Sequence, residues 1–327
     1  MVKVSGGLDL EGQTVDKSEQ DSDFVRISII VMFPLSLVGN GIAFIVLVFK
    51  KAKMTSYNVY MIVIAVSDTM VIVNHFIAYL GVSYFTVTLG VVFCKMSVAF
   101  QLFFSLNSNW VRIALTLERV IAVHLPFKAR DILTKNKSWV ICVAICAVMA
   151  IWVGVLPYQF ELVNVGDLES GTVYECSHKV YENPSTMWII THVLSGVVPF
   201  ILISIANTLL LIGVKSAQLK LRSSQSIDHF IQIARNVIAI SVCYIVFSFP
   251  MNILNILLPY LDLSKYIEVS TKVITTVAIL QNIATILFNV NFCINVGLYF
   301  YFNSLFRQYA KEVFDRYSCR CIRAGFH

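Results

Sequence analysis

Long apolar segments alternate with short polar ones along this chain, and the apolar segments occur seven times. They lie at about residues 27–49, 57–80, 91–123, 139–158, 187–214, 230–260 and 269–302. Each is long enough to cross a bilayer, which takes about 20 residues. Lipid offers backbone amides no hydrogen-bond partner, so each segment must be helical. The pattern therefore predicts an all-α membrane protein, a bundle of seven transmembrane helices.

The composition agrees with a polytopic membrane protein. Of the 327 residues, 57% are hydrophobic and 13% are charged. Soluble domains carry about 25% charged residues, roughly twice this share. Among the prolines within the spans, Pro199 lies in the fifth and Pro250 in the sixth. Because the ring removes a hydrogen-bond donor and clashes with the preceding turn, we expect a kink at each.

Lysine and arginine counts predict the orientation of the spans. Seventeen of the 25 lie in the odd-numbered gaps and the C-terminal tail, and seven lie in the even-numbered gaps and the N-terminal segment. Positive residues accumulate on the cytosolic side, so we expect the N-terminus outside and the tail in the cytosol. Residues 1–25 are acidic with little apolar surface, which predicts a disordered extracellular segment. The seven-transmembrane domain then covers residues 26–302.

Residues 303–327 are expected to form a short amphipathic helix and a cytosolic tail. Apolar residues recur at helical spacing with basic residues between them, which is typical of a helix on the membrane surface. Cys319 and Cys321 are candidates for palmitoylation, and unmodified thiols are the alternative. The apolar set is Phe302, Leu305, Phe306, Tyr309, Val313, Phe314 and Tyr317.

Glu118 and Arg119 form a charged pair at the cytosolic end of the third segment. Charged side chains near lipid are costly and usually functional, although a pair on its own could simply anchor a helix end. Further landmarks follow on the other spans, in order: Gly39-Asn40, Asp68, Cys94, Pro126, Pro199, Pro250, Asn291 and Asn295-Val296-Gly297-Leu298-Tyr299. Together with the charged pair, they resemble the rhodopsin-like G-protein-coupled receptors over about residues 27–317.

The resemblance implies a receptor that binds an extracellular ligand and activates heterotrimeric G proteins. It implies that Arg119 pairs with Glu118 at rest and is released when the sixth helix moves outward. Pro250, Asn295 and Tyr299 match positions that take part in activation. Arrestin and a receptor kinase are further partners of such receptors.

The resemblance also implies a disulfide between Cys94, at the start of the third span, and Cys176, in the second outer loop. Both face an oxidising compartment, where disulfides persist, and two free thiols are the alternative. Four residues depart from the family pattern, one of them Cys146, which stands where a tryptophan is expected in the fourth span. Val120 and Val296 replace a tyrosine and a proline, and Ser248 stands where relatives often carry a tryptophan. The role of that tryptophan therefore cannot be carried over.

A sodium site in the middle of the membrane is a second expectation from the resemblance. Arg112 complicates it, because it lies four residues after Ser108 on the same helix face, where relatives usually carry a neutral residue. We hypothesise that Arg112 pairs with Asp68 and replaces the ion; snorkelling of Arg112 toward the cytosol is the alternative. No other cofactor and no metal cluster is expected. The residues that match the sodium site are Asp68, Ser108, Asn291 and Asn295.

The predicted outer face is acidic, with thirteen carboxylates against seven cations. A cationic ligand would gain association rate from this field, and a solvated surface without a ligand role is the alternative. Ser108-Asn109-Trp110-Val111 and the short third inner loop resemble invertebrate neuropeptide receptors of the FMRFamide and myosuppressin type. We therefore expect a short, basic, amidated peptide ligand. Candidate pocket residues, each of which could instead be structural, are His75, Gln101, Thr191, His192, Asn252, Asn255 and Gln281.

Two other functions remain as alternatives. Within the family, the chain could be a chemosensory receptor for a small environmental molecule. Outside it, a transporter would also bury charges, but transporters typically show internal repeats and none is visible. An enzyme would need a nucleophile, base or metal constellation, which the sequence does not offer. We therefore expect a multi-pass receptor of the plasma membrane with no nucleic-acid partner.

Overall fold

The structure is a computed structural model that describes residues 13–49, 54–84, 87–154, 160–168, 171–178, 186–220, 225–258 and 271–324. Within these residues, seven helical segments are long and apolar enough to cross a membrane, as the sequence predicts. They are Ile27–Phe49, Ser56–Ala78, Gly90–His124, Lys135–Gly154, Thr186–Ser216, Ile231–Leu257 and Thr275–Cys293. The predicted seven-helix bundle is therefore confirmed.

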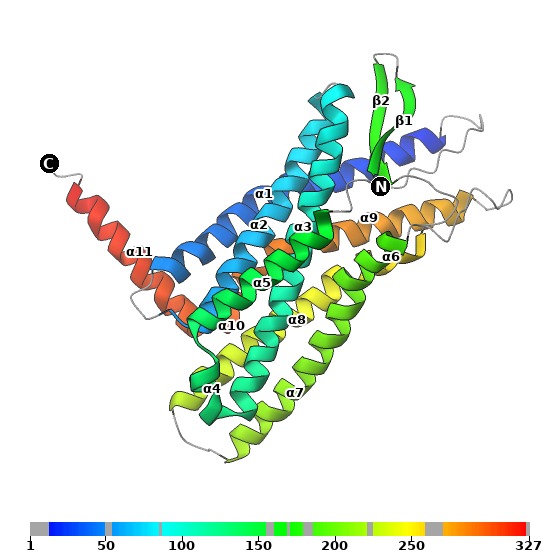
Figure 1. Ribbon diagram of the computed structural model, residues 1–327. Helices are drawn as coiled ribbons and strands as arrows, with labels where there is room; N and C mark the ends of the chain where they lie inside the picture. The colour runs from blue at the N-terminus through cyan, green and yellow to red at the C-terminus, as the bar shows by residue number, and fades with distance from the viewer. Residues whose placement is uncertain are drawn as a thin grey trace.

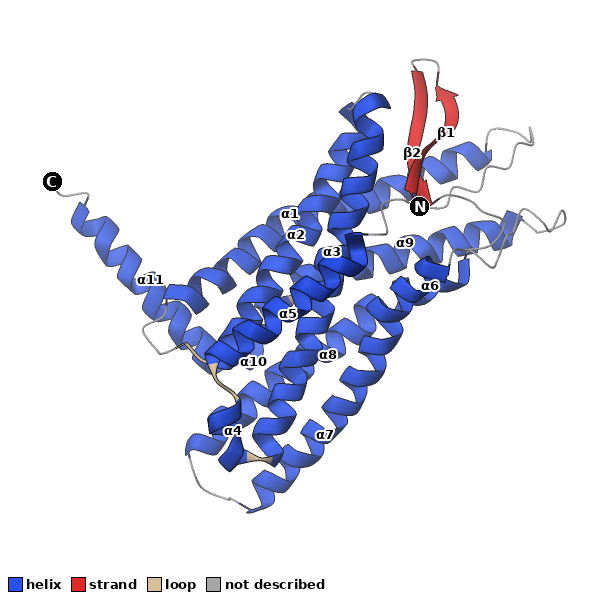
Figure 2. Ribbon diagram, in the orientation of Figure 1, coloured by secondary structure: helices blue, strands red, loops and turns tan. Residues whose placement is uncertain are grey.

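The spans belong to longer helices that lie side by side in one bundle (Figure 1, Figure 2). After the seventh span, the chain continues as α10 (Asn295–Phe302) and α11 (Ser304–Ala324), and the short α4 (Pro126–Ile132) joins the third span to the fourth. The helices of the bundle are α1 (Gln13–Phe49), α2 (Ser56–Tyr84), α3 (Val87–His124), α5 (Lys135–Gly154), α6 (Thr186–His192), α7 (Val198–Lys220), α8 (Gln225–Leu257) and α9 (Thr271–Cys293).

One end of the bundle, here called the Cys94 end, carries a β-hairpin that the sequence analysis does not predict. Strands β1 (Phe160–Leu168) and β2 (Gly171–His178) pair antiparallel, and both contact α3. The hairpin lies at the end opposite α4 (Figure 1). The end that carries α4 is here called the Arg119 end.

Two helix boundaries differ from the predicted segments. The predicted seventh segment, residues 269–302, is divided, because α9 ends at Cys293 and α10 begins at Asn295. Ile294 keeps helical dihedral angles, so the division is a local irregularity and not a loop. α1 begins at Gln13, whereas residues 1–25 are expected to be disordered. Residues 13–25 contain Gln13, Lys17, Glu19 and Gln20, which favour helix, and they continue the helix of the span beyond its apolar part.

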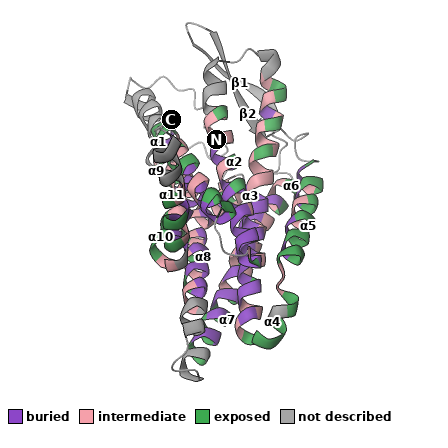
Figure 3. Cartoon of the chain, turned by 90° about the vertical axis from the view of Figure 1, so that its left-hand side faces the viewer, coloured by how far each residue is buried: buried purple, intermediate pink, exposed green. Residues whose placement is uncertain are grey.

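Residues in the centre of the bundle are buried, whereas the outer faces of several helices are exposed (Figure 3). Ile151 and Val140 of α5 are 76% and 68% exposed, as suits helix faces that meet lipid tails. The fully buried polar side chains gather near the middle of the bundle, where lipid and water are both excluded. They include Asp68, Ser108, Asn109, Arg112, Asn289, Asn291 and Asn295.

The amphipathic helix predicted after the seventh span is α11, which extends sideways from the bundle (Figure 1). Its Phe306, Ala310 and Val313 recur at helical spacing and are buried. Arg316 Nη1 donates to the carbonyl of Phe49, at the end of α1, over 3.5 Å. One face of α11 therefore packs on the bundle. Cys319 and Cys321 lie on α11, but their side chains fall outside the described part of the chain.

Candidate functional site

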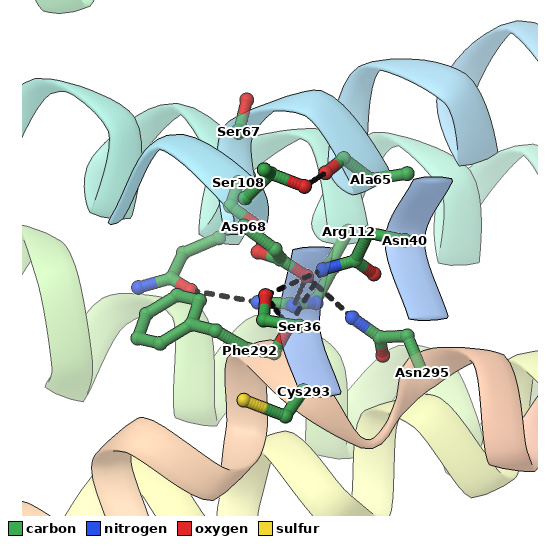
Figure 4. A network of polar contacts seen from close by, with 12 residues as sticks. Ser36, Asn40, Ala65, Ser67, Asp68, Ser108, Arg112, Phe292, Cys293 and Asn295 are labelled. Atoms are coloured by element: carbon green, nitrogen blue, oxygen red, sulfur yellow. Dashed lines mark hydrogen bonds and ion pairs between the residues drawn. The ribbon is translucent and has the colours of Figure 1, made fainter. Parts of the chain in front are cut away.

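Asp68 is the centre of a polar cluster in the middle of the bundle (Figure 4). Its side chain, on α2, is 0% exposed and pairs through Oδ2 with Arg112 Nη2 of α3 at 2.7 Å. Asn295 Nδ2, at the start of α10, donates to the same oxygen. Ser108 Oγ donates to Oδ1 at 2.5 Å. Three helices therefore meet at one carboxylate.

Arg112 is fully engaged inside the bundle. Besides its ion pair with Asp68, it donates through Nη1 to Asn109 Oδ1 at 3.1 Å. Its guanidinium lies 5.8 Å from the ring centroid of Tyr244 on α8, a cation–π distance. A buried charge is tolerated only when it is paired and hydrogen-bonded, and both conditions are met here. The side chain therefore does not snorkel toward the cytosol.

The residues around Asp68 do not fit a sodium ion. Hard cations need oxygen lone pairs that are free to coordinate them. Both Asp68 oxygens accept hydrogen bonds, and Arg112 brings a positive charge to the same carboxylate. Asn291 is buried, but its Nδ2 makes no hydrogen bond within the described residues. The donor set favours a guanidinium as the partner of Asp68.

Asn40 ties α1 to the division between α9 and α10 (Figure 4). Its Nδ2 donates to the carbonyl of Phe292 at 2.9 Å and to Ser36 Oγ at 3.0 Å. The Phe292 carbonyl lies next to the point where α9 ends at Cys293. The side chain of Asn40 thus supplies a hydrogen bond where the helix becomes irregular, close to Asn295.

A branch of hydrogen bonds leads from Arg112 to the fifth and sixth spans. Asn109, which accepts a hydrogen bond from Arg112, donates through Nδ2 to the carbonyl of Ser195 at 2.9 Å. Tyr244 Oη of α8 donates to the same carbonyl at 2.8 Å. These four residues are buried. The Ser195 carbonyl thus joins α3 to α8 through the fifth span.

The Ser195 carbonyl is free to accept these bonds because of Pro199. In an α-helix it would accept from the N–H of residue 199, which proline lacks. The segment Val193–Val197 is a π-helical turn, η2, between α6 and α7, and such turns are frequent at functional sites. The Leu194 carbonyl accepts from Trp110 Nε1 at 3.1 Å. Side chains of α3 and α8 therefore satisfy carbonyls in the irregular part of the fifth span.

Gly196 permits a close approach between η2 and α8. A Cβ atom added at Gly196 would lie 2.3 Å from Asn252 Cβ, far inside van der Waals contact. Asn252 Oδ1 accepts from Ser195 Oγ at 2.7 Å, and its Nδ2 donates to the Ser248 carbonyl at 2.9 Å. Asn252, a predicted pocket residue, therefore joins the fifth span to the sixth.

Two more predicted pocket residues make contacts near the start of the fifth span. Thr191 Oγ1 donates to the Met187 carbonyl at 2.7 Å and accepts from Trp152 Nε1 at 3.3 Å. His192 packs edge-on against Trp188, with ring centroids 4.3 Å apart. Both residues are buried, and Thr191 joins the fifth span to Trp152 of the fourth.

The remaining predicted pocket residues lie on other spans. Gln101 Oε1 accepts from Asn74 Nδ2 at 3.3 Å, whereas its Nε2 has no hydrogen-bond partner among the described residues. The same holds for Nδ1 of His75. The backbone carbonyls of Asn255 and Gln281 accept from side chains of other residues. Among the described residues, Gln101 and His75 therefore each keep one polar side-chain atom without a hydrogen bond, whereas both polar side-chain atoms of Asn252 are bonded.

Cys94, at the end of the bundle named after it, is buried and disulfide-bonded. β2 contains Cys176 and contacts α3, the helix that carries Cys94. The side chain of Cys176 falls outside the described part of the chain, so its pairing with Cys94 stays a prediction.

At the Arg119 end, Glu118 and Arg119 form an ion pair within α3. Glu118 also accepts hydrogen bonds from Ser56 Oγ of α2 at 2.9 Å and from Ser138 Oγ of α5 at 3.3 Å. Arg119 Nε has no hydrogen-bond partner in the described residues, and its guanidinium lies 5.5 Å from the ring centroid of Tyr57. Glu118 thus connects three helices, while Arg119 keeps an unused donor.

The other predicted activation residues lie on separate helices. Pro250 lies inside α8. Tyr299 of α10 is 0% exposed, and its hydroxyl makes no hydrogen bond within the residues described. Its ring packs edge-on against Phe306 of α11, with centroids 5.5 Å apart. Only Asn295 of this group bonds directly to Asp68.

The sequence alone does not predict which side chains connect these sites. Asn109, Ser195 and Tyr244 join Asp68 and Arg112 to the sixth span. Two signals were available in the sequence. Asn109 precedes Arg112 by one helical turn, and Ser195 stands four residues before Pro199, where a proline leaves a carbonyl free.

Comparison with known proteins agrees with this geometry. The sequence model described as 7 transmembrane receptor (rhodopsin family) matches residues 39–299. The thyrotropin-releasing hormone receptors of Mus musculus, Bos taurus and Ovis aries are each 26% identical to the chain over 180 residues. The matched stretch covers 54% of this chain and 45% of each receptor, so it spans about half the length of these relatives.

Proposed function

Because the chain belongs to the rhodopsin family of seven-transmembrane receptors, we propose that it binds an extracellular ligand and activates heterotrimeric G proteins. The observation that carries this proposal is the arrangement at the Arg119 end. Glu118 is bonded to three helices, whereas Arg119 keeps an unused donor and can change partners. The family is one of receptors, and not of enzymes. Arrestin and a receptor kinase are further partners of this proposal.

The proposed orientation places the Cys94 end outside the cell and the Arg119 end in the cytosol of a plasma-membrane receptor. The excess of lysine and arginine in the odd-numbered gaps and the tail supports it. The disulfide at Cys94 supports it as well, because disulfides persist in oxidising compartments.

The proposed ligand is a short, basic, amidated peptide. The acidic excess at the outer face supports a cationic ligand. Relatives of the chain are named for a hormone, which supports a secreted signalling molecule. Gln101 Nε2 and His75 Nδ1, which have no partner among the described residues, are suited to bonding the amide groups of a peptide.

The proposed mechanism is a shift between two populations. Ligand at the Cys94 end favours a state in which α8 moves away from Arg119 and a G protein binds there. The shift can be no larger than the difference in ligand affinity between the two states. The hydrogen bond from Ser195 Oγ to Asn252, and those from Tyr244 and Asn109 to the Ser195 carbonyl, support coupling between the fifth and sixth spans and the middle of the bundle.

The test is G-protein activation in transfected cells challenged with a library of short amidated peptides. The expected result is a saturable response that is lost in Arg119→Ala at equal surface expression. Matched peptides with a free carboxylate or without basic residues would test the amide and the charge separately. A wild type that reaches the surface but responds to no peptide would contradict the peptide ligand and favour a small environmental molecule.

A further inference from the structure

Two uncharged hydrogen bonds hold the Arg119 end of the sixth span. Asn236 Nδ2 of α8 donates to Tyr57 Oη of α2 at 2.6 Å. One turn earlier on α8, Gln232 Oε1 accepts from the hydroxyl of Ser304, the first residue of α11. Residues four apart lie on the same face of a helix, so the two bonds hold one face of α8.

Tyr57 contacts the key arginine as well as the sixth span. Its ring centroid lies 5.5 Å from Arg119 Cζ, while its hydroxyl accepts the bond from Asn236. Tyr57 and Asn236 are 5% and 0% exposed. Their hydrogen bond therefore forms away from water, where such bonds are electrostatically stronger. The side chain of Tyr57 thus contacts both Arg119 and α8.

The charged residues do not fasten α8. Arg119 pairs with Glu118 of its own helix, and Ser56 and Ser138 hold that carboxylate from α2 and α5. No ion pair joins Arg119 to α8 within the residues that the structure describes. Among the described residues, the polar contacts that join residues 232 and 236 of α8 to neighbouring helices are hydrogen bonds between neutral side chains.

We propose that Tyr57, Asn236, Gln232 and Ser304 form an uncharged latch that keeps the sixth span closed over Arg119 and sets signalling without ligand. The latch rests on the proposed function, because its opening is the movement that admits a G protein. Opening it separates Asn236 from Tyr57 and leaves Arg119 facing a space that α8 has vacated. The latch residues therefore position Arg119 and do not themselves need to touch the G protein.

The free energy of one neutral hydrogen bond is suitable for this role. One such buried bond changes the ratio of closed to open receptor by about two- to tenfold. A latch of two bonds keeps the closed state dominant, and a ligand of modest differential affinity can still open it.

Tyr57→Phe is the sharpest test, because it removes one oxygen atom and keeps the ring over Arg119. Ligand-independent G-protein activation, normalised to surface expression, should rise about two- to tenfold. Asn236→Ala should give a similar rise. The double variant should not exceed the larger single effect, because both changes remove the same bond.

Tyr60→Phe is the matched control. Tyr60 lies three residues later on α2, is 1% exposed, and makes no hydrogen bond to α8 within the described residues. Its substitution should leave ligand-independent activation unchanged. Equal rises in Tyr57→Phe and Tyr60→Phe would overturn the latch. Unchanged activation in Tyr57→Phe would also overturn it when the wild type activates a G protein on ligand addition.

Hydrogen–deuterium exchange of the purified receptor, without G protein, separates the latch from the proposed function. Tyr57→Phe should speed exchange in residues 231–240 of α8 and leave α5 unchanged. If exchange rises but neither form activates any G protein, the latch stands and the proposed function fails. If the wild type signals on ligand addition but exchange and activation are unchanged in Tyr57→Phe, the latch is wrong and the function stands.

Discussion

The cluster around Asp68 and the charged pair at the Arg119 end combine a carboxylate and a guanidinium in opposite ways. At Asp68, the two groups come from α2 and α3, and their side chains are 0% and 2% exposed. At the Arg119 end, both come from α3, and the Arg119 side chain is 9% exposed. The first pair fastens two helices together. The second can exchange one partner for another without separating any helices.

The two ion pairs also differ in the hydrogen bonds that surround them. Asp68 accepts from Ser108, Arg112 and Asn295. Arg119 Nε, in contrast, has no hydrogen-bond partner among the described residues. An unsatisfied buried donor raises the free energy of its state, and a new partner would lower it again. Substitutions at the Asp68 cluster should therefore reduce stability, and substitutions at the Arg119 end should change signalling.

Arg112→Met is the largest expected perturbation of the Asp68 cluster. It keeps a long side chain but leaves the buried Asp68 without its ion-pair partner, and breaking a buried pair costs about 3–5 kcal/mol. We expect a large fall in surface expression and in the thermal stability of the purified receptor.

Asp68→Asn combined with Arg112→Met is the control for this loss. Because it removes both charges, it should recover most of the stability that Arg112→Met alone loses. A single variant as stable as the wild type would show that the ion pair does not fasten α2 to α3. The expected contrast is Arg119→Met, which should preserve expression and abolish signalling.

Gly196→Ala tests the connection between the Asp68 cluster and the sixth span, with an intermediate expected effect. The new Cβ would lie 2.3 Å from Asn252 Cβ, so η2 and α8 must move apart. Overpacking of this kind costs about 1–3 kcal/mol. Displacing η2 also stretches the bonds that Asn109 and Tyr244 make to the Ser195 carbonyl.

Gly41→Ala is the matched control, because no atom within 4 Å would meet its new Cβ. We expect a lower melting temperature and a weaker response to ligand in Gly196→Ala, and neither change in Gly41→Ala. Identical behaviour of the two variants would mean that η2 and α8 separate without consequence. The measurements are thermal unfolding of the purified receptor and ligand-dependent G-protein activation.

The comparison of the two regions also explains what the sequence can and cannot predict. The seven spans and the Glu118–Arg119 pair are local signals, since each depends only on the length of an apolar segment or on charges within it. Arg112 was also conspicuous, because a charge inside an apolar segment must find a partner. Its spacing from Ser108 is enough to direct attention to Asp68.

The residues that connect the regions could not be predicted in the same way. The Ser195 carbonyl is a backbone group, and the π-helical turn decides which side chains reach it. Tyr57 and Asn236 lie 179 positions apart in the sequence, and nothing local to either predicts that they meet. Neutral polar side chains in apolar helices are common, so their partners emerge only from the packing of the bundle.

The β-hairpin and the start of α1 were missed for a different reason. Segments between the spans and at the termini carry no apolar periodicity that fixes their structure, so composition alone describes them as polar. The hairpin of β1 and β2 is stabilised by pairing and by its contacts with α3, which only the assembled bundle provides. The polar turns at Gln13 and beyond continue a helix that the membrane span has already nucleated.

Adding sodium should change the stability of the receptor least. The experiment tests whether a guanidinium, and not a sodium ion, is the partner of Asp68. Replacing choline by sodium at constant ionic strength should leave the melting temperature of the wild type unchanged. Both Asp68 oxygens already accept hydrogen bonds, and Arg112 repels a second cation. A rise in melting temperature of the wild type with sodium would contradict this assignment.

Arg112→Thr sharpens the same test, because it removes the positive charge and adds a hydroxyl oxygen near Asp68. The variant should be less stable than the wild type in choline and should gain about 1–2 °C in sodium, the shift in melting temperature that roughly 1 kcal/mol of ion binding gives in a chain of this size. Asp68→Asn in the same background should abolish the gain, because it removes the carboxylate that binds the ion. A gain that survives Asp68→Asn would place the ion elsewhere. Sodium binding in Arg112→Thr but not in the wild type would mean that the guanidinium of Arg112 takes the place of the ion. As part of the chain, this cation fastens α3 to α2 whatever the sodium concentration around the cell.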